Sequence, residues 1–286
     1  MNNIIDGKLV AASIKEKVRE EVAKLKRKNI NVKLAVIMVG NNPASQVYVN
    51  NKKKACEDLG ILSTQLMLPE DIGQERLHEL INDLNNDPSV NGILCQLPLP
   101  VGYEEKAIIE AISPEKDVDC FHPTNVGRIM TGDYGFLPCT PAGIMEMLSY
   151  YNIDVTSKEC VVVGRSNIVG KPLNMLLLNK HGTVTVAHSK TKNLAEICRR
   201  ADILVAAVGK PKFITADMVK EGAVVIDVGI NRMDDGKLCG DVDFANVLPK
   251  ASYITPVPGG VGPMTIAVLM QNTLVAAKRQ NKLIGD

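Results

Sequence analysis

Short runs of consecutive apolar residues alternate along this chain with segments in which apolar residues recur every three or four positions. The recurring spacing predicts amphipathic helices, and the continuous runs predict strands buried on both faces of a parallel sheet. In the first part of the chain we expect helices at residues 11–28, 45–59, 75–84 and 104–112. We expect the strands between them at residues 34–39, 62–68 and 92–97. This order is typical of an α/β protein.

The stretch 113–141 interrupts the alternation, because it is rich in Pro, Gly and Asp and has no clear period. It predicts a long connection, of the kind that is usually functional or linking. Thr140 and Pro141 then suit the N-cap and the first residue of a helix that runs to about residue 151. Alternation resumes with strands near 160–164, 183–187, 203–207, 223–229 and 253–257, and a last helix follows from residue 264.

The simplest architecture is a pair of doubly wound α/β domains around an interdomain cleft. We place the boundary at the end of the long connection, so that residues 1–139 form an N-terminal α/β domain. Residues 140–286 then form a Rossmann-like domain, and we expect the final helix, at about 264–282, to pack back on the first domain.

Composition excludes several classes of protein. A net charge of +1 and an aromatic content of 3% argue against a nucleic-acid surface. No apolar run approaches the ~20 residues that cross a bilayer, and the first residues lack the layout of a signal peptide. The seven Cys include no C-x-x-C pair and the four His show no ligand spacing. We therefore expect no metal, no membrane contact, and reduced thiols in a cytoplasmic protein.

A glycine-containing loop joins the apolar run that ends at Val163 to the next helix. It runs from Gly164 to Gly170, at the place where α/β proteins hold a dinucleotide pyrophosphate. The segment departs from G-x-G-x-x-G, since Ser166 replaces the second glycine and the last glycine comes one residue late. A plain strand–helix junction is therefore the alternative. Arg165 at the strand end, and helix N–H groups that would be unpaired, favour a phosphate site.

The end of the next strand distinguishes NADP from NAD. An NAD site usually has Asp or Glu here, which accepts from the ribose 2′-hydroxyl. Residues 188–192 read His-Ser-Lys-Thr-Lys instead. A hydroxyl and two ammonium groups, with Arg165 nearby, suit a 2′-phosphate, and an exposed basic loop is the alternative. The pattern favours NADP.

A phenol and an amine four residues apart are the first candidates for catalysis. Tyr48 and Lys52 share one face of the helix expected at 45–59. A lysine that is partly desolvated or crowded by like charges favours its neutral amine, which can act as a base. Gln96 ends an apolar strand, where a polar amide needs a partner. A solvated lysine run and a surface glutamine are the alternatives.

Two further segments are candidates for substrate binding. Alternation suggests that Asp117 and Asp119 project to the same side, where one carboxylate would accept from the N–H groups of a ligand. Residues 256–263 contain three Pro and three Gly. So much proline predicts a shaped loop that forms a wall of the substrate site.

Taken in order, these segments resemble the bifunctional methylenetetrahydrofolate dehydrogenase/methenyltetrahydrofolate cyclohydrolase family. The matching segments are Tyr48-Val-x-x-Lys52, the Gly-Ile-Leu-Cys-Gln-Leu-Pro-Leu-Pro of 92–100, and those at 114–119, 138–141, 164–172 and 256–265. The resemblance implies hydride transfer from 5,10-methylenetetrahydrofolate to NADP, followed by hydrolysis of the 5,10-methenyl product to 10-formyltetrahydrofolate. Such one-carbon interconversion supplies purine, histidine and methionine synthesis.

The resemblance also implies roles for the matching residues. Lys52 would assist proton transfer during hydration, Tyr48 would position the folate, and Gln96 would tune Lys52. Asp119 would hold the pterin ring. The other residues implied in binding are Gly164, Arg165, Ser166, Ser189 and Ile230 for NADP, and Pro258, Gly259 and Gly262 for the folate. The family further implies a homodimer, with residues 1–139 as the catalytic, folate-binding domain.

Three alternatives remain at this stage. The chain could be a dehydrogenase alone, a folate-binding protein without catalysis, or another NADP dehydrogenase that resembles shikimate dehydrogenase. It also departs from the family at Cys120, where the pattern has Gly. If that position has a positive φ, a Cys there costs about 1–2 kcal/mol. We expect its thiol to be inert.

Overall fold

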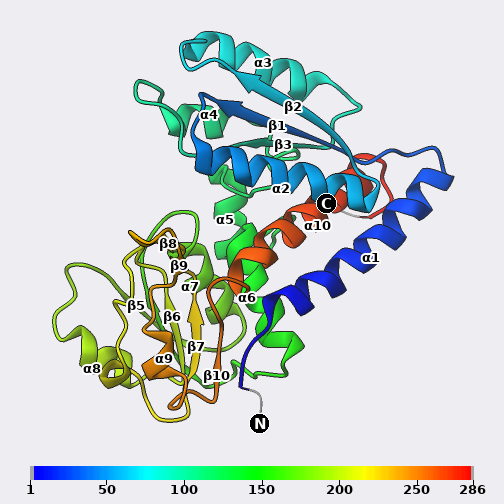
Figure 1. The fold of residues 1–286 in the computed structure, drawn as a ribbon. Coiled ribbons are helices and arrows are strands. Elements are labelled where there is room, and N and C mark those ends of the chain that lie inside the picture. The colour runs from blue at the N-terminus through cyan, green and yellow to red at the C-terminus, as the bar shows by residue number, and fades with distance from the viewer. Residues whose placement is uncertain (1–2, 285–286) are drawn as a thin grey trace. The chain divides into compact units, whose positions relative to one another are not determined.

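The computed structural model describes residues 3–284 and divides the chain into two compact units (Figure 1). We call them the three-stranded unit, Ser13–Leu137 with the residues from Ile266 on, and the five-stranded unit, the residues up to Ala12 with Pro138–Thr265. The division falls within the first and the last helix. The structure defines these units by packing, so the assignment of ligands to residues 1–139 and 140–286 stays a prediction.

The three-stranded unit is built around a parallel sheet with the strand order β2-β1-β3. Its elements are α1 (Gly7–Arg27), β1 (Lys33–Val39), α2 (Pro43–Leu59), β2 (Leu62–Leu68), α3 (Gln74–Asn86), β3 (Gly92–Cys95), α4 (Glu105–Ala111) and α5 (Pro123–Thr131). Successive side chains of β1 point to opposite faces of the sheet, and both faces are covered, so that all β1 residues after Lys33 are buried. Ala35 and Ile37 pack with Leu77 of α3 and Ile108 of α4, which explains the continuous apolar run.

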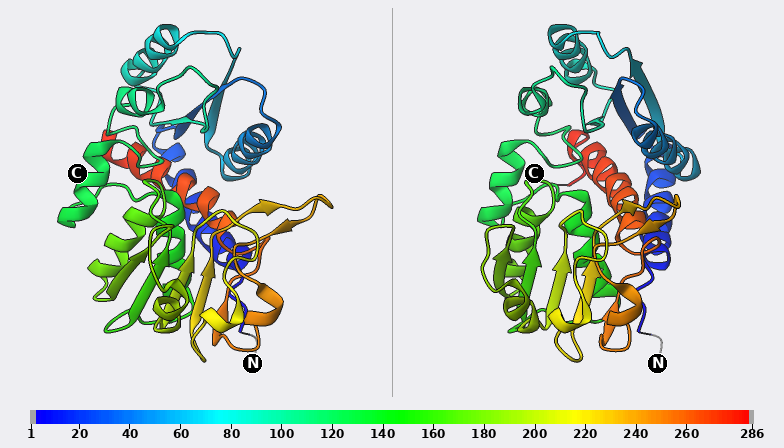
Figure 2. Two further views of the ribbon diagram at one scale, coloured as in Figure 1. Left: turned by 90° about the vertical axis from the view of Figure 1, so that its left-hand side faces the viewer. Right: turned by 60° about the vertical axis from the view of Figure 1, so that its left-hand side comes forward.

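The five-stranded unit contains a parallel sheet with the order β10-β7-β6-β4-β5 (Figure 2). Its elements are α6 (Cys139–Tyr150), β4 (Glu159–Val163), α7 (Gly170–Asn179), β5 (Thr183–Ala187), α8 (Leu194–Arg199), β6 (Ile203–Ala206), η1 (Ala216–Met218), β7 (Val224–Asp227), β8 (Asn231–Arg232), β9 (Leu238–Cys239), α9 (Phe244–Val247) and β10 (Tyr253–Ile254). The last helix, α10 (Val261–Gln280), begins in this unit and continues in the three-stranded unit. The chain winds outward from β4 to β5 and then crosses to β6 on the other side of β4. The carboxyl ends of β4 and β6 are therefore a topological switch point, where α/β proteins bind ligands.

The structure confirms the predicted α/β class with parallel sheets and most of the predicted elements. Gly60 ends α2 as expected, with φ 73° and the following N–H, of Ile61, bonded to the carbonyl of Cys56 at 2.9 Å. The prediction for 113–141 was wrong, because this stretch contains α5. That helix begins at Pro123 after the His122 side chain caps it, and it ends at a left-handed Gly132. Nine residues are too few to show a helical period.

The starts of two other helices differ from the prediction. α6 begins at Cys139 with Pro138 as N-cap, so Thr140 is not the cap. Its hydroxyl lies 2.9 Å from the hydroxyl of Thr265 instead. α10 begins at Val261, three residues before the expected start. Proline is common at the first helical residue but also occurs later in the first turn, so the Thr140-Pro141 pair led to a predicted start of α6 that was too late.

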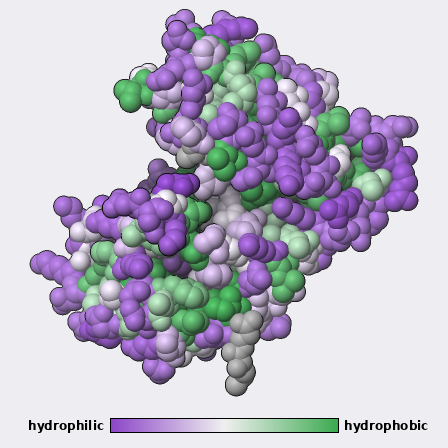
Figure 3. All heavy atoms as spheres, viewed as in Figure 1, coloured by the Kyte–Doolittle hydropathy of each residue, from purple (hydrophilic) through white to green (hydrophobic). Residues whose placement is uncertain are grey.

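Hydrophilic residues cover much of the face seen in Figure 3, with hydrophobic residues scattered among them on both units. Between residues 3 and 284, no helix combines the length and the apolar character that a bilayer crossing requires.

Two buried carboxylates join the loops at the carboxyl edge of the five-stranded sheet. Asp241 is fully buried and accepts from the backbone N–H groups of Val208, Gly209 and Lys210 at 2.6, 2.9 and 2.9 Å. Asp227, at the end of β7, accepts from the N–H groups of Gly229, Asp241 and Val242, each at 2.9 Å. The loops after β6, β7 and β9 are thereby held together.

Glycine is required at two places in this arrangement. A Cβ at position 240 would lie 1.8 Å from Asp227 Oδ2, and one at position 229 would lie 2.2 Å from Asp241 Oδ1. Gly240 and Gly229 therefore allow the two carboxylates to reach their backbone donors.

Burial raises the pKa of Asp227 from 3.8 to about 6, with the charge of Asp241 acting in the same direction. A raised carboxyl pKa favours the folded state below the unfolded pKa, and this contribution is lost as the pH rises through the folded value. Relative to Asp227→Asn, the natural protein should therefore lose about 2 kcal/mol of unfolding free energy between pH 4 and 7. Denaturant unfolding of both proteins across this range measures the difference, and parallel pH profiles would contradict the assignment.

Candidate active site

The three-stranded unit brings Lys52 and Gln96 into direct contact. Lys52 Nζ donates to Gln96 Oε1 at 2.9 Å, and the Lys52 side chain is buried although its neighbours Lys53 and Lys54 are exposed. The Gln96 amide is oriented by a second bond, from its Nε2 to the carbonyl of Leu97 at 2.6 Å. With its donor side occupied, Gln96 presents its oxygen to the lysine. The solvated-run interpretation is therefore wrong for Lys52.

The backbone fixes where these two residues lie. The Gln96 N–H bonds to the carbonyl of Ile37 at 2.8 Å, which continues the pairing of β3 with β1. α2 follows β1 directly and contacts it, so its third turn returns Lys52 to the carboxyl edge of the sheet. Tyr48 lies one turn earlier on the same helix and is 42% exposed. An exposed phenol beside a buried amine is available to a ligand.

Asp119 lies in the same neighbourhood. The pKa of the Cys95 thiol is raised to about 12, mainly by burial, with the charges of Glu105 and Asp119 acting in the same direction and that of Lys52 in the opposite one. Both charges are therefore close to Cys95, the residue before Gln96. The structure thus joins Lys52 to Gln96, and the assignment of Asp119 to the same site stays a prediction.

Asp117 is held by groups of its own segment. Its carboxylate is buried and accepts from the N–H of His122 at 2.9 Å, the N–H of Phe121 at 3.2 Å and the Asn125 amide at 2.9 Å. Burial is the main cause that raises its pKa. Asp117 therefore shapes the turn that leads into α5, and the expectation that Asp117 and Asp119 project alike stays a prediction.

Lys116 in the same segment is also structural. Its ammonium donates to the carbonyls of Leu84 and Asp87 at 2.9 and 2.7 Å, at the end of α3. A cation is favourable there because it complements the helix dipole. Lys116 therefore fixes the start of the segment that leads to Asp119.

Cys120 has the left-handed conformation that its glycine counterpart would adopt without strain, with φ 61°. Its Sγ lies 3.4 Å from the carbonyl of Phe136, and the thiol is fully buried. Burial moves the pKa of the thiol far above its usual range, so the thiolate is strongly disfavoured. Its burial supports the prediction of an inert thiol.

In the five-stranded unit, two glycines bring the loop after β4 close to its neighbours. A Cβ on Gly164 would lie 2.3 Å from the carbonyl oxygen of Ala207, and one on Gly170 would lie 2.3 Å from that of Gly164. The close approach of β4, β6 and the start of α7 therefore depends on both residues. A backbone cradle of this kind fits a dinucleotide at the switch point.

Ser166 has a role that the sequence did not reveal. Its Oγ accepts from the N–H groups of Val169 and Gly170 at 3.2 and 3.3 Å. The expectation that the N–H groups at the start of α7 are unpaired is therefore wrong for these two. Since Oγ acts as the acceptor in both contacts, its own hydrogen is the group that Ser166 can donate to a phosphate.

A pocket lies at the carboxyl ends of β4, β5 and β6. It is lined by Val163, Gly164, Arg165, His188, Ser189, Leu194, Ala207, Val208, Lys210 and Phe213. The predicted residues Gly164, Arg165 and Ser189 thus meet at one place. The lining contains two cationic side chains and no carboxylate, the arrangement expected for a ligand with a phosphate rather than a free ribose hydroxyl. The residues present therefore fit NADP.

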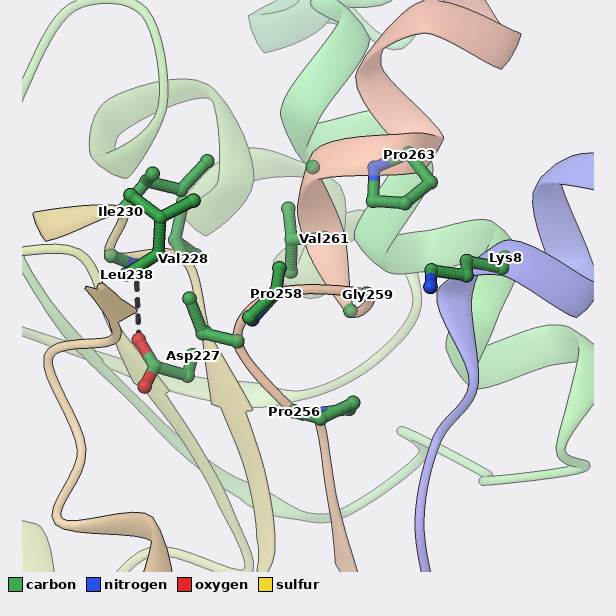
Figure 4. A pocket seen from close by; sticks show the side chains of 14 residues that line it. Lys8, Asp227, Val228, Ile230, Leu238, Pro256, Pro258, Gly259, Val261 and Pro263 are labelled. Atoms are coloured by element: carbon green, nitrogen blue, oxygen red, sulfur yellow. Dashed lines mark hydrogen bonds between the residues drawn. The ribbon is translucent and has the colours of Figure 1, made fainter. Parts of the chain in front are cut away.

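A second pocket brings Ile230 together with Pro258, Gly259 and Gly262 (Figure 4). Its wall is the shaped loop of 256–263, which the sequence predicted as a substrate wall. Gly7 at the start of α1 packs directly on this loop, because a Cβ there would lie 1.8 Å from the carbonyl oxygen of Gly260. Ile230 and the loop were assigned to different ligands, yet they line the same pocket.

Several lining residues were missed from the sequence. In the second pocket they are Lys8, Asp227 and Leu238, and in the first they are Leu194, Val208, Lys210 and Phe213. The glycine-ended segments 205–211 and 225–231 were the available signal for Val208, Lys210 and Asp227. Lys8 and Leu238 lie far from any motif. Within residues 3–284, no group of three or more His, Cys, Asp or Glu is arranged to hold a metal ion.

The conformation of Cys120 gives a test of the turn beside Asp119. At most positions Gly is less stable than Ala by 0.5–1 kcal/mol, but Ala is strained at positive φ. We expect Cys120→Gly to exceed Cys120→Ala in unfolding free energy by about 1 kcal/mol. The same pair at Cys198, a buried residue of α8, should show the opposite order. Thermal or denaturant unfolding measures both pairs, and the same order at both positions would contradict the strain.

Comparison with known proteins matches both parts of the chain. The family model described as tetrahydrofolate dehydrogenase/cyclohydrolase, catalytic domain, covers residues 5–119. The model described as tetrahydrofolate dehydrogenase/cyclohydrolase, NAD(P)-binding domain, covers residues 138–281. The chain is 60% identical over 279 residues to the bifunctional protein FolD of Agathobacter rectalis, covering 98% of this chain and 100% of that protein.

Solved structures give the same result. The bifunctional enzyme FolD, methylenetetrahydrofolate dehydrogenase/cyclohydrolase, of Campylobacter jejuni has 54% identity and a TM-score of 0.95, with 96% of this chain and 98% of that chain covered. The Trypanosoma brucei enzyme, solved with NADP cofactor and an inhibitor, has 40% identity and a TM-score of 0.93, with 98% of each chain covered. Shikimate dehydrogenase of Thermus thermophilus, at 17% identity and a TM-score of 0.53, covers 87% of this chain and 99% of its own, and shares only the fold. The chain therefore belongs to the tetrahydrofolate dehydrogenase/cyclohydrolase family.

Proposed function

We propose that this protein oxidises 5,10-methylenetetrahydrofolate with NADP and hydrolyses the resulting 5,10-methenyl cation to 10-formyltetrahydrofolate. The observation that carries the proposal is the buried Lys52 bonded to an oriented Gln96 at 2.9 Å, with Asp119 nearby. Family membership over nearly the whole chain supports it. NADP when bound accepts the hydride, and the chemistry of the second reaction falls to the protein's own side chains.

Hydration of the cation requires a group that moves protons near the attacked carbon. An amine can remove a proton from the attacking water, and geometry decides whether it reaches. The amide oxygen of Gln96 accepts one N–H of Lys52, whether the nitrogen is an ammonium or an amine, and this bond orients the nitrogen. The remaining positions are free to face the substrate. Lys52 is therefore the group that handles the proton, and Gln96 orients it.

Tyr48 and Asp119 would hold the folate beside this pair. The exposed phenol ring of Tyr48 offers a flat apolar surface for the folate, one turn from the reacting amine. A carboxylate at Asp119 can accept from the N–H groups of the pterin ring. The folate would then be held by residues of the three-stranded unit. Pro258, Gly259 and Gly262 are proposed as folate contacts from the family resemblance alone.

The cofactor would bind along the carboxyl edge of the five-stranded sheet. Arg165 and Ser189 suit the 2′-phosphate, Gly164 lets the backbone approach, and the hydroxyl hydrogen of Ser166 can bind a phosphate oxygen. Ile230 lies farther along the same edge, after β7. The wall residues thus support NADP rather than NAD.

Further expectations rest on the family resemblance, for the homodimer, and on composition, for the location and the absent partners. We propose a homodimer that acts in the cytoplasm on a small-molecule substrate, without a nucleic-acid or membrane partner. Sedimentation should give a mass twice that of the 31.0 kDa chain. A concentration-independent monomer would contradict the dimer without bearing on the chemistry.

The function is tested by following two signals from the purified protein with 5,10-methylenetetrahydrofolate and either NADP or NAD. We expect reduced nicotinamide to form faster with NADP, and the methenyl intermediate to accumulate no more than its spontaneous hydrolysis allows. Accumulating methenyl compound would show a dehydrogenase alone. No reduction with either cofactor would favour a folate-binding protein without catalysis.

Replacing the lysine separates catalysis from folding. Lys52→Met keeps the length of the buried side chain and removes the amine, so hydrolysis of methenyltetrahydrofolate should fall by about 100-fold or more. Lys53→Met, on the exposed side of the same helix, is the matched control and should hydrolyse at the natural rate. Measured rates of methenyl hydrolysis test this, and an unchanged rate in Lys52→Met would remove the lysine from the mechanism.

A further inference from the structure

The pocket at the ends of β4, β5 and β6 contains a cation that has no assigned role. Lys210 lines it together with Arg165 and Ser189. Among the described residues, neither the Lys210 ammonium nor the Arg165 guanidinium has a carboxylate within ion-pair distance. Two like charges that converge on one pocket without a counter-ion favour an anionic ligand.

The position of Lys210 is strongly determined. Its own N–H is one of three consecutive backbone donors to Asp241, at 2.9 Å, and Asp241 is fully buried. The Asn231 side chain donates to the same carboxylate at 2.9 Å, so both oxygens of Asp241 are used. The loop that carries Lys210 is therefore held in place by the buried Asp241 carboxylate.

The side chain is also supported. The Lys210 ammonium lies 5.6 Å from the centroid of the Phe213 ring, which forms another part of the pocket wall. A cation over an aromatic face is stabilised without being neutralised. The ring therefore supports the Lys210 side chain without supplying a counter-ion.

The phosphate that occupies this pocket can be distinguished by what lines it. A dinucleotide pyrophosphate binds at the helix N-terminus, here the start of α7. Ser166, Val169 and Gly170, which form that start, do not line the pocket. His188 and Ser189 do, and they follow β5, where the ribose 2′-position of a dinucleotide lies.

We propose that Lys210 is a second cationic residue of the 2′-phosphate site and a determinant of NADP specificity, held in place by Asp241. The proposal rests on the proposed NADP-dependent function. It adds the loop after β6 to the residues that distinguish the two cofactors. An ammonium and a guanidinium on different loops would contact the same phosphate from two sides.

The test compares binding of 2′,5′-ADP and 5′-AMP to the full chain by calorimetry, since the two probes differ by the phosphate in question. We expect Lys210→Gln to weaken 2′,5′-ADP about tenfold and to change 5′-AMP less than about twofold. Lys210→Arg should restore most of the loss, because it returns the charge. Lys212→Gln, an exposed lysine two residues on that does not line the pocket, is the matched control and should bind both probes like the natural protein.

The outcomes separate this proposal from the one on which it rests. If the natural protein binds 2′,5′-ADP no more tightly than 5′-AMP, the preference for NADP is wrong. If it discriminates and Lys210→Gln discriminates equally well, Lys210 has no part in it. Equal weakening of both probes would place Lys210 at another part of the nucleotide, and that result would also overturn the proposal.

Discussion

The hydrogen bond between Lys52 and Gln96 is the contact on which the proposed chemistry depends. A buried ammonium is costly unless it has partners, and here one partner is a neutral amide whose other end is tied to the backbone at 2.6 Å. A carboxylate in place of Gln96 would form an ion pair with Lys52 and stabilise its charged form. A neutral acceptor orients the nitrogen and leaves it able to exchange a proton with a substrate.

The three-stranded unit supplies this contact through ordinary features of a parallel sheet. β3 pairs with β1, so that the residue after β3 lies at the edge from which α2 starts. Asp117 and Lys116 fix the following segment by bonding to backbone groups, which positions Asp119 without using it. The chemistry therefore rests on residues whose side chains are oriented by neighbours that do not react.

The five-stranded unit reaches comparable rigidity by a different means. Its edge loops are held by Asp227 and Asp241, two buried carboxylates that accept from backbone N–H groups and have Gly229 and Gly240 beside them. Such loops carry the groups that would contact the cofactor. Burying the Asp227 carboxylate raises its pKa, so its charged form lowers the stability of the folded state at neutral pH. The fold gives up this stability for a fixed loop geometry.

The sequence was sufficient for the fold class and for most elements, because apolar spacing and strand ends are local signals. The pairing of Lys52 with Gln96 followed from the family resemblance, because this contact joins segments 44 residues apart in the chain. Prediction failed at α5, whose nine residues are too short for a period, and at Ser166, whose hydroxyl accepts the N–H groups that were expected to be unpaired. Lys210 and Phe213 were missed because they line the same pocket as Arg165 only through the order of the strands. The chain passes from β5 to β6 on the other side of β4, and the sequence does not reveal this order.

The measurement that tests the central claim most directly is a double-mutant cycle on the hydrolysis of methenyltetrahydrofolate, with Lys52→Met, Gln96→Ala and the two combined. If Gln96 acts by orienting Lys52, its replacement slows hydrolysis only while the amine is present. The account predicts that the double variant is no slower than Lys52→Met alone. Multiplied losses in the double variant would contradict it, because Gln96 would then act on the reaction independently of the lysine.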